Sequence, residues 1–469
     1  MISIDALPDD VLLPIFDFYL HEDLGPNEST RAWQSLVHVC RRWRSVVFGS
    51  PRRLELRLFC TNTTRSRDML DIWPTLPLII EGDRFYSTRC VDNIVAALEY
   101  SDRVCEIDLQ NFGTFDLERF LAAMQQPFRE LTYLGLGRDR GIDDIHETVV
   151  VPDSFLGGFA PRLEDLWLDW IPFPGLPKLL LSATHLVDLR LDQIPHSGYF
   201  SPDAMVAALS ALTSIEYLTL TFESPESSPD LETRRLPPST RSVLPVLTSF
   251  QFKGGSEYLE DLVTDIDAPR LKTLEIVFFN DIIFDTPQMI RFIGRTRISS
   301  ALKNAHITLR DGVARVTFRS QIYGHVELKV EISCEGLDWQ LSSLEQVCNS
   351  CSPFLPTLED LYINEYYPRS EPDWEDDIGN NGLWLELFRP FTAVQNFYIS
   401  KIIGLRIGLA FRELVEGRAI EVLPALKNIF LGGVVPLGRE QGGIGQFVAA
   451  RRVSNHPVTI SCWINSEER

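Results

Sequence analysis

The amino-acid sequence predicts an α/β protein in which a short N-terminal helical module precedes an irregular array of strand and helix repeats. Three observations lead to this prediction. Two segments before residue 50 carry apolar stripes at helical spacing, and a six-residue strand pattern then returns ten times. Between the seventh and eighth copies, alternating apolar residues on both sides of an Asp-Gly pair predict an antiparallel β meander.

The first helix of the module is expected to begin at Pro8. A proline suits the first helical turn because its missing N–H has no intrahelical partner there, and Asp9 and Asp10 place negative charge at the positive end of the helix dipole. Apolar residues then form one stripe: Val11, Leu12, Ile15, Phe16 and Tyr19. Pro14 removes a hydrogen bond to the carbonyl of Asp10, so we expect it to kink or shorten this helix.

The next segment carries one apolar stripe and most of another. The first consists of Trp33, Leu36, Cys40, Trp43 and Val47, and the second of Val39, Trp43 and Val46. A unit of about 50 residues buries only about 60% of its surface, so part of this apolar face should contact a partner. A small helical cap on a larger domain is the alternative interpretation. The alternating residues Leu54, Leu56 and Leu58 predict the first strand of the array.

Taken in order, these motifs resemble the F-box family. The resemblance is carried by Leu7-Pro8, the acidic helix start, Ile15-Phe16, Val39-Cys40-x-x-Trp43-Arg44 and the Leu-x-Leu exit. In that family the module binds a small Skp-type adaptor, which attaches it to a cullin in the SCF class of ubiquitin ligases. The resemblance implies a docking set of Leu7, Pro8, Leu12, Ile15, Phe16, Val39, Cys40 and Trp43. The connection from His21 to Thr30 is longer than is usual in the family.

Composition excludes several other classes of protein. The chain has 469 residues, a hydrophobic fraction of 45% and a net charge of -21, which argues against a nucleic-acid-binding face and favours a basic or neutral protein partner. No run of 18 apolar residues and no basic signal region is present, so we expect a cytoplasmic or nuclear protein that contacts no membrane. The eight cysteines are spread along the chain and are expected to be free thiols.

The repeat has the form apolar-x-x-apolar-x-apolar, and its last residues alternate as in a short strand. Within each run, successive copies start 23 to 36 residues apart. The copies are VCEIDL from Val104, LTYLGL from Leu131, LEDLWL from Leu163, LVDLRL from Leu186, IEYLTL from Ile215, LTSFQF from Leu247, LKTLEI from Leu271, LEDLYI from Leu358, VQNFYI from Val394 and LKNIFL from Leu426. Several intervals contain a plausible helix, such as 203–212.

A strand and a helix in every 20 to 30 residues or so resemble the leucine-rich repeat, whose units stack into a curved solenoid. Only the first half of that motif matches, because Ile171, Ile194 and Glu223 stand where asparagine or cysteine is expected. The predicted domains are an F-box at 1–60, a leucine-rich-repeat-like solenoid at 61–300, a meander insertion at 301–335 and a second part of the solenoid at 336–469. An ordinary α/β domain with scattered strands of this pattern is the alternative. The overall layout resembles the F-box proteins of mushroom-forming fungi.

The meander is predicted from three alternating runs. Two lie within 306–318 on either side of Asp311-Gly312, the third covers 326–332, and a helix is expected at 337–347. Two charged loops, 223–240 and 371–377, are expected to be exposed. Ser224 and Ser228 each precede a proline in the first loop, so it is either a phosphorylation site that Arg234 and Arg235 could contact or an ordinary connector.

Motifs for chemistry are weak. Cys348-x-x-Cys351 has no second ligand pair, and the glycine run at 442–445 is followed by no Lys-Ser or Lys-Thr, so we interpret it as a flexible turn. The acidic residues Asp376 and Asp377 are expected to belong to a solvated loop. No histidine occurs in a catalytic motif. We therefore expect no catalytic residue, no metal and no cofactor.

The sequence favours an interaction protein, namely a substrate-recognition adaptor subunit of an SCF-type ubiquitin ligase with a Skp-type adaptor, a cullin and an unidentified target as partners. Such a subunit raises the effective concentration of a target near the ubiquitin-charged enzyme and needs no active site. An F-box scaffold acting outside a ligase is one alternative. A carbohydrate-active β-solenoid enzyme is another, but it would require paired carboxylates in a cleft and usually a secretory signal.

Overall fold

The computed structural model describes residues 7–21, 26–63, 65–85, 87–139, 149–224, 241–279, 286–320, 326–366, 381–401, 403–414, 418–432 and 441–463. The chain divides into two compact units, Met1–Phe200 with Ala207–Ile215, and Ser201–Val206 with Glu216–Arg469. Both are mixed α/β with mostly parallel strands. The predicted loop at 371–377 and most of the predicted loop at 223–240, including Ser228, Arg234 and Arg235, lie outside the described residues.

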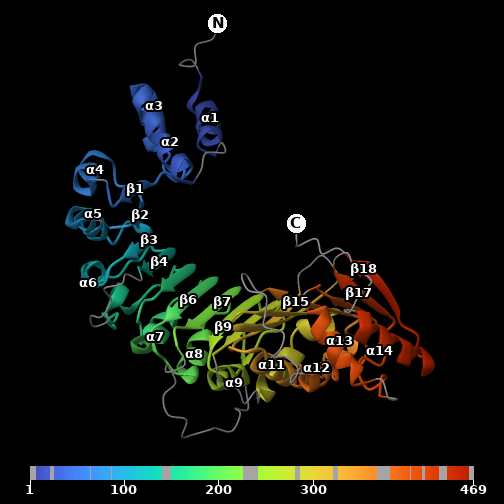
Figure 1. Cartoon of the computed structure of the whole chain (residues 1–469). Helices are drawn as coiled ribbons and strands as arrows, with labels where there is room; N and C mark the ends of the chain where they lie inside the picture. Colours follow the sequence, from blue (N-terminus) through green and yellow to red (C-terminus); the bar gives the residue numbers. More distant parts are fainter. Residues whose placement is uncertain are drawn as a thin grey trace. The chain divides into compact units, whose positions relative to one another are not determined.

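The first unit begins with three helices, α1 (Asp9–His21), α2 (Pro26–Val39) and α3 (Arg41–Gly49) (Figure 1). Of the two effects expected of Pro14, a kink or a shorter helix, the second is wrong, because α1 includes Pro14 and is 13 residues long. The long connection predicted from His21 to Thr30 is also wrong in its second half, since α2 starts at Pro26. Cys40 caps α3 by accepting a 3.4 Å hydrogen bond on Sγ from the backbone N–H of Trp43.

The strand predicted at Leu54 to Leu58 is wrong except for its last residue. Strand β1 (Leu58–Thr61) starts only at Leu58. Leu54 lies in a turn and Leu56 just after it, and their backbone N–H groups donate to the carbonyls of Ser50 and Pro51. Both leucine side chains are nevertheless buried. The alternating leucines are therefore buried residues but not strand residues. The positive φ of Glu55 (46°), between them, lets the backbone turn while both side chains stay buried.

The strands of the first unit pair in chain order and in parallel. They are β1, β2 (Leu78–Asp83), β3 (Val104–Phe112), β4 (Tyr133–Arg138), β5 (Asp165–Asp169) and β6 (Asp188–Ile194). The helices between them are α4 (Ser66–Ile72), α5 (Thr88–Leu98), α6 (Thr114–Ala123) and α7 (Leu176–Leu180), and α8 (Pro202–Leu209) follows. Alternate apolar side chains of these strands are buried, and α4, α5 and α6 lie along one side of β1 to β4 (Figure 1).

The second unit contains ten strands of one sheet among its described residues, in the order β7-β9-β11-β14-β13-β12-β15-β16-β17-β18. Their bounds are β7 (Tyr217–Phe222), β9 (Ser249–Gly254), β11 (Thr273–Phe278), β12 (Asn304–Arg310), β13 (Val313–Arg319), β14 (Glu327–Ser333), β15 (Asp360–Tyr366), β16 (Asn396–Ile399), β17 (Asn428–Gly432) and β18 (Thr459–Trp463). Two short strands, β8 (Ser242–Val243) and β10 (Ile266–Asp267), form a separate pair. The helices are α9 (Ser256–Thr264), α10 (Pro287–Gly294), α11 (Leu337–Ser350), α12 (Asn381–Phe388), α13 (Gly404–Arg412) and α14 (Gln441–Val453).

Every copy of the six-residue pattern forms a strand, as predicted. Nine of these strands begin at the third residue of the pattern, and β3 begins at the first. The first apolar position of each pattern is buried as well, although in most copies it precedes the strand. The first apolar position of the pattern is therefore a buried residue that usually precedes the strand. The other two are alternating strand residues whose side chains point into the core.

The predicted meander forms within the sheet. Strand β13 pairs antiparallel with both β12 and β14, and Gly312 takes the positive φ (70°) of the turn before β13. The outer two strands are parallel to the neighbouring repeats, β14 to β11 and β12 to β15. The meander thus continues the hydrogen-bonded sheet, but its strands lie in the order β14, β13, β12, the reverse of their order in the chain.

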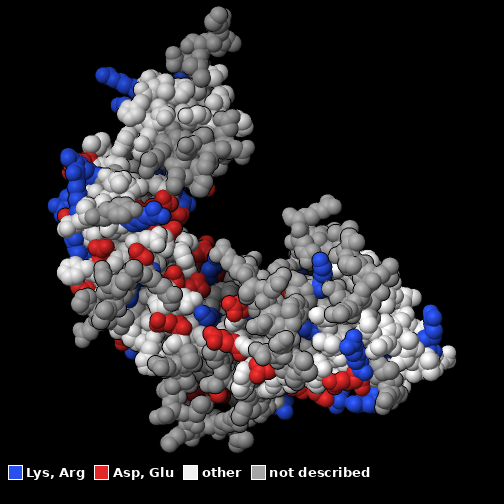
Figure 2. All heavy atoms as spheres, in the orientation of Figure 1, with Lys and Arg blue, Asp and Glu red and all other residues white. Residues whose placement is uncertain are grey.

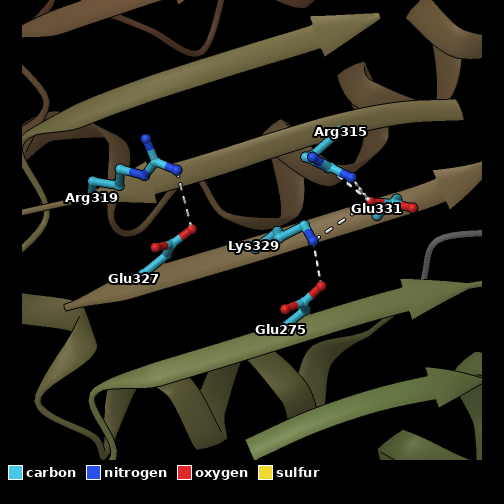
Figure 3. A network of polar contacts seen from close by, with 6 residues as sticks. All are labelled: Glu275, Arg315, Arg319, Glu327, Lys329 and Glu331. Atoms are coloured by element: carbon cyan, nitrogen blue, oxygen red, sulfur yellow. Dashed lines mark hydrogen bonds and ion pairs between the residues drawn. The ribbon is translucent and has the colours of Figure 1, made fainter. Parts of the chain in front are cut away.

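Charged side chains of both signs lie on one face of β13, β14 and the neighbouring β11 (Figure 3). Lys329 of β14 contacts Glu275 of β11 and lies 3.7 Å from Glu331, which accepts a 2.7 Å hydrogen bond from Nε of Arg315 in β13. Opposite charges on adjacent strands stabilise a sheet. This network favours the observed register over a shifted one.

The flexible turn predicted at 442–445 is wrong, because α14 begins at Gln441 and includes the glycines. A Cβ atom on Gly443 would lie 1.8 Å from the carbonyl oxygen of Gly408 in α13. The glycine is therefore required by the close approach of two helices. Cys348 and Cys351, at the end of α11, are fully buried free thiols, and burial raises the pKa of Cys351 to about 12.

Candidate functional site

The residues of the predicted docking set fall into two groups in the N-terminal helices. Leu12 and Phe16 are fully buried, and the Phe16 ring lies 4.7 Å from that of Trp43. Pro8, Ile15 and Val39 are exposed, and the others, Leu7, Cys40 and Trp43, are half-buried. Leu12 and Phe16 therefore form the core of the helical module, and only the other residues of the docking set can contact a partner directly.

The exposed apolar residues of α1 form a continuous stripe. We call Pro8, Val11, Ile15, Phe18 and Tyr19 the α1 stripe. The four larger side chains are 38% to 71% exposed, with Phe18 the most exposed. Their i, i+4, i+7 and i+8 spacing places them on one side of the helix, next to the buried side that contains Leu12 and Phe16. Phe18 was missed by sequence reasoning, although its position three residues after Ile15 is a usable signal.

Two sets of contacts hold α1 and α2 in place. Arg42 of α3 donates hydrogen bonds from Nε and Nη2 to Oδ1 of Asp9, at 3.2 and 2.8 Å, and from Nη2 to the carbonyl of Leu7. Trp33 of α2 donates from Nε1 to the carbonyl of Arg57 at 3.0 Å, and its ring lies 5.2 Å from that of Trp73. These Trp33 contacts connect the helical module to the start of the sheet. The strand predicted at Leu54 does not make this connection.

A second surface lies on the side of the first sheet opposite its buried leucines. Here the strands present a set of carboxylates that we call the acidic face: Glu81, Asp83, Glu106, Asp108, Asp165, Asp169, Asp188 and Asp192. Three arginines pair with members of it, Arg57 with Glu106, Arg84 with Asp83 and Arg190 with Asp188. Figure 2 shows Asp and Glu side chains gathered over this part of the chain.

Burial and nearby carboxylates raise the pKa of two side chains on this side of the sheet. Burial, followed by the charges of Asp188 and Glu164, raises the pKa of Asp165 above its ordinary value. Burial and the charges of Asp108 and Asp165 raise the pKa of Tyr133 to about 12. In both cases burial is the largest cause, and neighbouring carboxylates add to it.

We expect Asp165→Asn to stabilise the protein at pH 7 by about 0.2–1 kcal/mol, because Asp165 and Asp188 are cross-strand neighbours of like charge. A carboxyl whose pKa is raised by folding binds its proton more tightly in the folded state, so its unfavourable contribution appears as pH rises and vanishes below its unfolded pKa. Urea unfolding of both proteins at pH 7 and pH 3 checks this, with equal stabilities expected at pH 3. A less stable variant at pH 7 would contradict the prediction.

Among the described residues, no group of three or more His, Cys, Asp or Glu side chains is arranged to hold a metal ion. The helices of that part of the chain also include none with the length and apolar content of a membrane span.

The fold and these two surfaces define a mixed α/β protein that joins a three-helix module to repeated strand–helix units. No protein-family model matches the chain, and no curated protein matches it.

Proposed function

We propose that this protein is the substrate-recognition adaptor subunit of an SCF-type ubiquitin ligase. In this proposal the N-terminal helices bind a Skp-type adaptor, and the sheet carries a target protein. The observation that supports it best is the α1 stripe, a contiguous apolar surface on a helix that other parts of the same unit hold in place. Exposed contiguous apolar patches favour association with another protein.

The F-box-like sequence and the burial pattern of α1 favour the same partner. The motif residues Leu12 and Phe16 form the core that orients the helix, while Ile15 and its neighbours in the α1 stripe remain available. A helix face with apolar residues at i, i+4 and i+7 suits insertion between helices of another protein. The Skp-type adaptor is the partner that the resemblance implies.

The acidic face supports a basic target segment over an acidic one. Eight carboxylates lie on one side of the first sheet and three arginines form ion pairs with members of this set, so the potential there is negative. Such a potential speeds the association of a positively charged partner and disfavours a negatively charged one. The adaptor itself requires no reactive group, because it acts by bringing the target close to the ubiquitin-charged enzyme.

We expect Ile15→Asp to reduce the affinity for a purified Skp-type adaptor at least about 100-fold, because a carboxylate in a desolvated apolar interface is strongly unfavourable. Ile15 is 41% exposed, so the variant should remain folded. The matched control is Phe115→Asp, which places the same charge at an exposed apolar position in the first turn of α6. Titration calorimetry and circular dichroism on the full chain measure both properties.

An unchanged adaptor affinity in Ile15→Asp would overturn the docking assignment, as would an equal loss in Phe115→Asp. Co-purification of a cullin with the adaptor separates a ligase subunit from a scaffold that acts outside a ligase. A complex that retains the adaptor but binds no cullin would contradict the ligase proposal.

A further inference from the structure

The second unit carries a group of mostly uncharged side chains on the face of its sheet opposite the helices, over β12 and β15 to β18. They form three rows that follow the strand register. In the first row each side chain bonds to the next. Asn396 donates to Asp360 at 2.7 Å, Asn428 donates to Asn396 at 2.8 Å, and Thr459 donates to Asn428 at 2.7 Å. This row satisfies itself and offers little to a ligand.

The second row is a stack of four rings. His306, Tyr362, Tyr398 and Phe430 follow one another with centroids 4.2–4.5 Å apart and ring planes within 9° of parallel. Burial, with Arg319 nearby, lowers the pKa of His306 to about 4, so this ring is neutral at pH 7. The faces of the inner rings contact each other, which makes the stack a rigid, uncharged wall.

The third row differs because two polar groups in it have no partner. Asn364 and Ser400 follow Tyr362 and Tyr398 by two residues and so lie on the same face of the sheet, where they are only 9% and 6% exposed. The Ser400 N–H donates to the carbonyl of Ile363 at 3.0 Å, which keeps the two residues on adjacent strands. Among the described residues, however, neither Oδ1 of Asn364 nor Oγ of Ser400 has a hydrogen-bond partner.

Such groups are unusual in a folded protein, because a buried polar atom without a partner destabilises the native state. Every side chain of the first row shows that this face can satisfy its own hydrogen bonds. Two neighbouring exceptions at the same end of adjacent strands therefore point to a hydrogen-bonding ligand.

An aromatic side chain lies beside this pair. Trp463 is opposite Gly432 in the register of β17 and β18, and its indole N–H reaches across to the carbonyl of Ile399 at 3.4 Å. Its ring lies 5.4 Å from that of Tyr398 and 6.0 Å from that of Tyr362, edge to face. A Cβ atom on Gly432 would lie 3.3 Å from the Ile399 carbonyl oxygen, which accepts from the indole, and 3.3 Å from Cα of Ser400, so these groups lie close together.

The chemistry of these groups selects the ligand. The unpartnered atom of Asn364 is its carboxamide oxygen, which accepts hydrogen bonds and so disfavours an anion next to it, and the second and third rows contain no carboxylate that could neutralise a buried cation. A neutral hydroxyl can donate to Asn364 and can either donate to Ser400 or accept from it. An aromatic ring next to such groups suits a ligand with an apolar C–H face.

We propose that Asn364, Ser400 and Trp463 form a binding site for a neutral saccharide, either free or attached to a protein. Its hydroxyl groups complete the hydrogen bonding of Asn364 and Ser400, and its C–H face packs against the indole. This inference concerns the second unit alone and does not depend on the α1 stripe.

The test uses the full chain and an array of glucose, mannose, galactose and N-acetylglucosamine oligomers of defined length. For the saccharide that binds best, calorimetry should show at least a tenfold loss of affinity in Ser400→Ala and in Asn364→Leu. The matched control is Ser461→Ala, an exposed position on β18 opposite Phe430, which should bind like the unmodified protein. The melting temperature of Ser400→Ala should be unchanged or higher, because the substitution removes a hydroxyl that only the ligand satisfies.

A second comparison distinguishes the two sources of the saccharide. A glycoprotein that carries the bound saccharide should bind more tightly than its deglycosylated form if the ligand is a protein-attached glycan, and the free oligosaccharide should suffice otherwise. Failure of every oligomer to bind at millimolar concentration would overturn the proposal. So would equal affinity of Ser400→Ala, or a lower melting temperature of Ser400→Ala without saccharide binding, which would indicate an ordered water only.

Discussion

Arg406→Ala is expected to destabilise the second unit by about 3–5 kcal/mol, the usual effect of removing one partner from a buried ion pair. Nη1 of Arg406 in α13 donates to Oε1 of Glu365 in β15 at 2.8 Å, and the two side chains are 7% and 0% exposed. The substitution leaves the Glu365 carboxylate in a buried site without its cation. Urea unfolding of the full chain, followed by circular dichroism and tryptophan fluorescence, measures the loss.

Two comparisons test the cause of that loss. Arg389→Ala removes an arginine from an exposed pair with Glu386, at 2.9 Å, and is expected to change stability by less than about 1 kcal/mol. The double variant Glu365→Leu with Arg406→Met removes both charges and should recover most of the stability, because an apolar pair of similar volume is often as stable as a buried ion pair. If Arg406→Ala were no more destabilising than Arg389→Ala, the pair would not be a buried one in solution.

Gly443→Ala is expected to destabilise the packing of α13 against α14 by about 1–3 kcal/mol or more, as other overpacked sites do. The added Cβ would lie 1.8 Å from the Gly408 carbonyl oxygen and 2.5 Å from its carbon, so one helix must move. The neighbouring Gly445 provides a matched control in the same helix, because no atom lies within 4 Å of its Cβ position.

At that control position the expected effect has the opposite sign. Gly445→Ala should stabilise the protein by about 0.5–1 kcal/mol, because alanine loses less backbone entropy than glycine on entering a helix. Thermal unfolding of the two single variants gives the comparison directly. Destabilisation by both substitutions, or by neither, would show that α13 and α14 do not approach closely at Gly443.

The repeated strands were predictable because the physical signal in each is local. A strand with one buried face alternates its side chains, so the pattern within LKTLEI or LEDLYI is enough to locate β11 and β15. The Asp311-Gly312 pair located the hairpin of β12 and β13 for the same reason, since only a few residue pairs tolerate the backbone of that turn.

Two local interpretations were wrong because a pattern of apolar residues or glycines does not specify the backbone conformation. The leucines from Leu54 to Leu58 alternate as in a strand. The first two are buried, yet the backbone after α3 forms a turn there and not a strand. The glycines at 442–445 look like a flexible turn, yet Gly443 is helical because α14 lies against Gly408. A periodic pattern reports which side chains are buried and does not specify what buries them.

The candidate docking surface was likewise only partly predictable from the sequence. The apolar spacing of α1 predicted one stripe, and the structure divides that stripe into a buried half with Leu12 and Phe16 and an exposed half with Ile15. Phe18, the most exposed of these apolar residues, could not be ranked above Phe16 from spacing alone. Exposure depends on where α2 and α3 lie, and no single helix contains that information.

The α/β class, the positions of ten repeat strands and the hairpin at Asp311-Gly312 could be predicted from the sequence, because these depend on side-chain periodicity and turn preferences within a few residues. Only the tertiary structure decided the reversed order of β12, β13 and β14, the buried pair of Glu365 and Arg406, and the unpartnered groups of Asn364 and Ser400. Each of these depends on contacts between segments far apart in the chain. Whether a side chain is buried depends on all the residues that pack around it, and a local sequence pattern does not identify them.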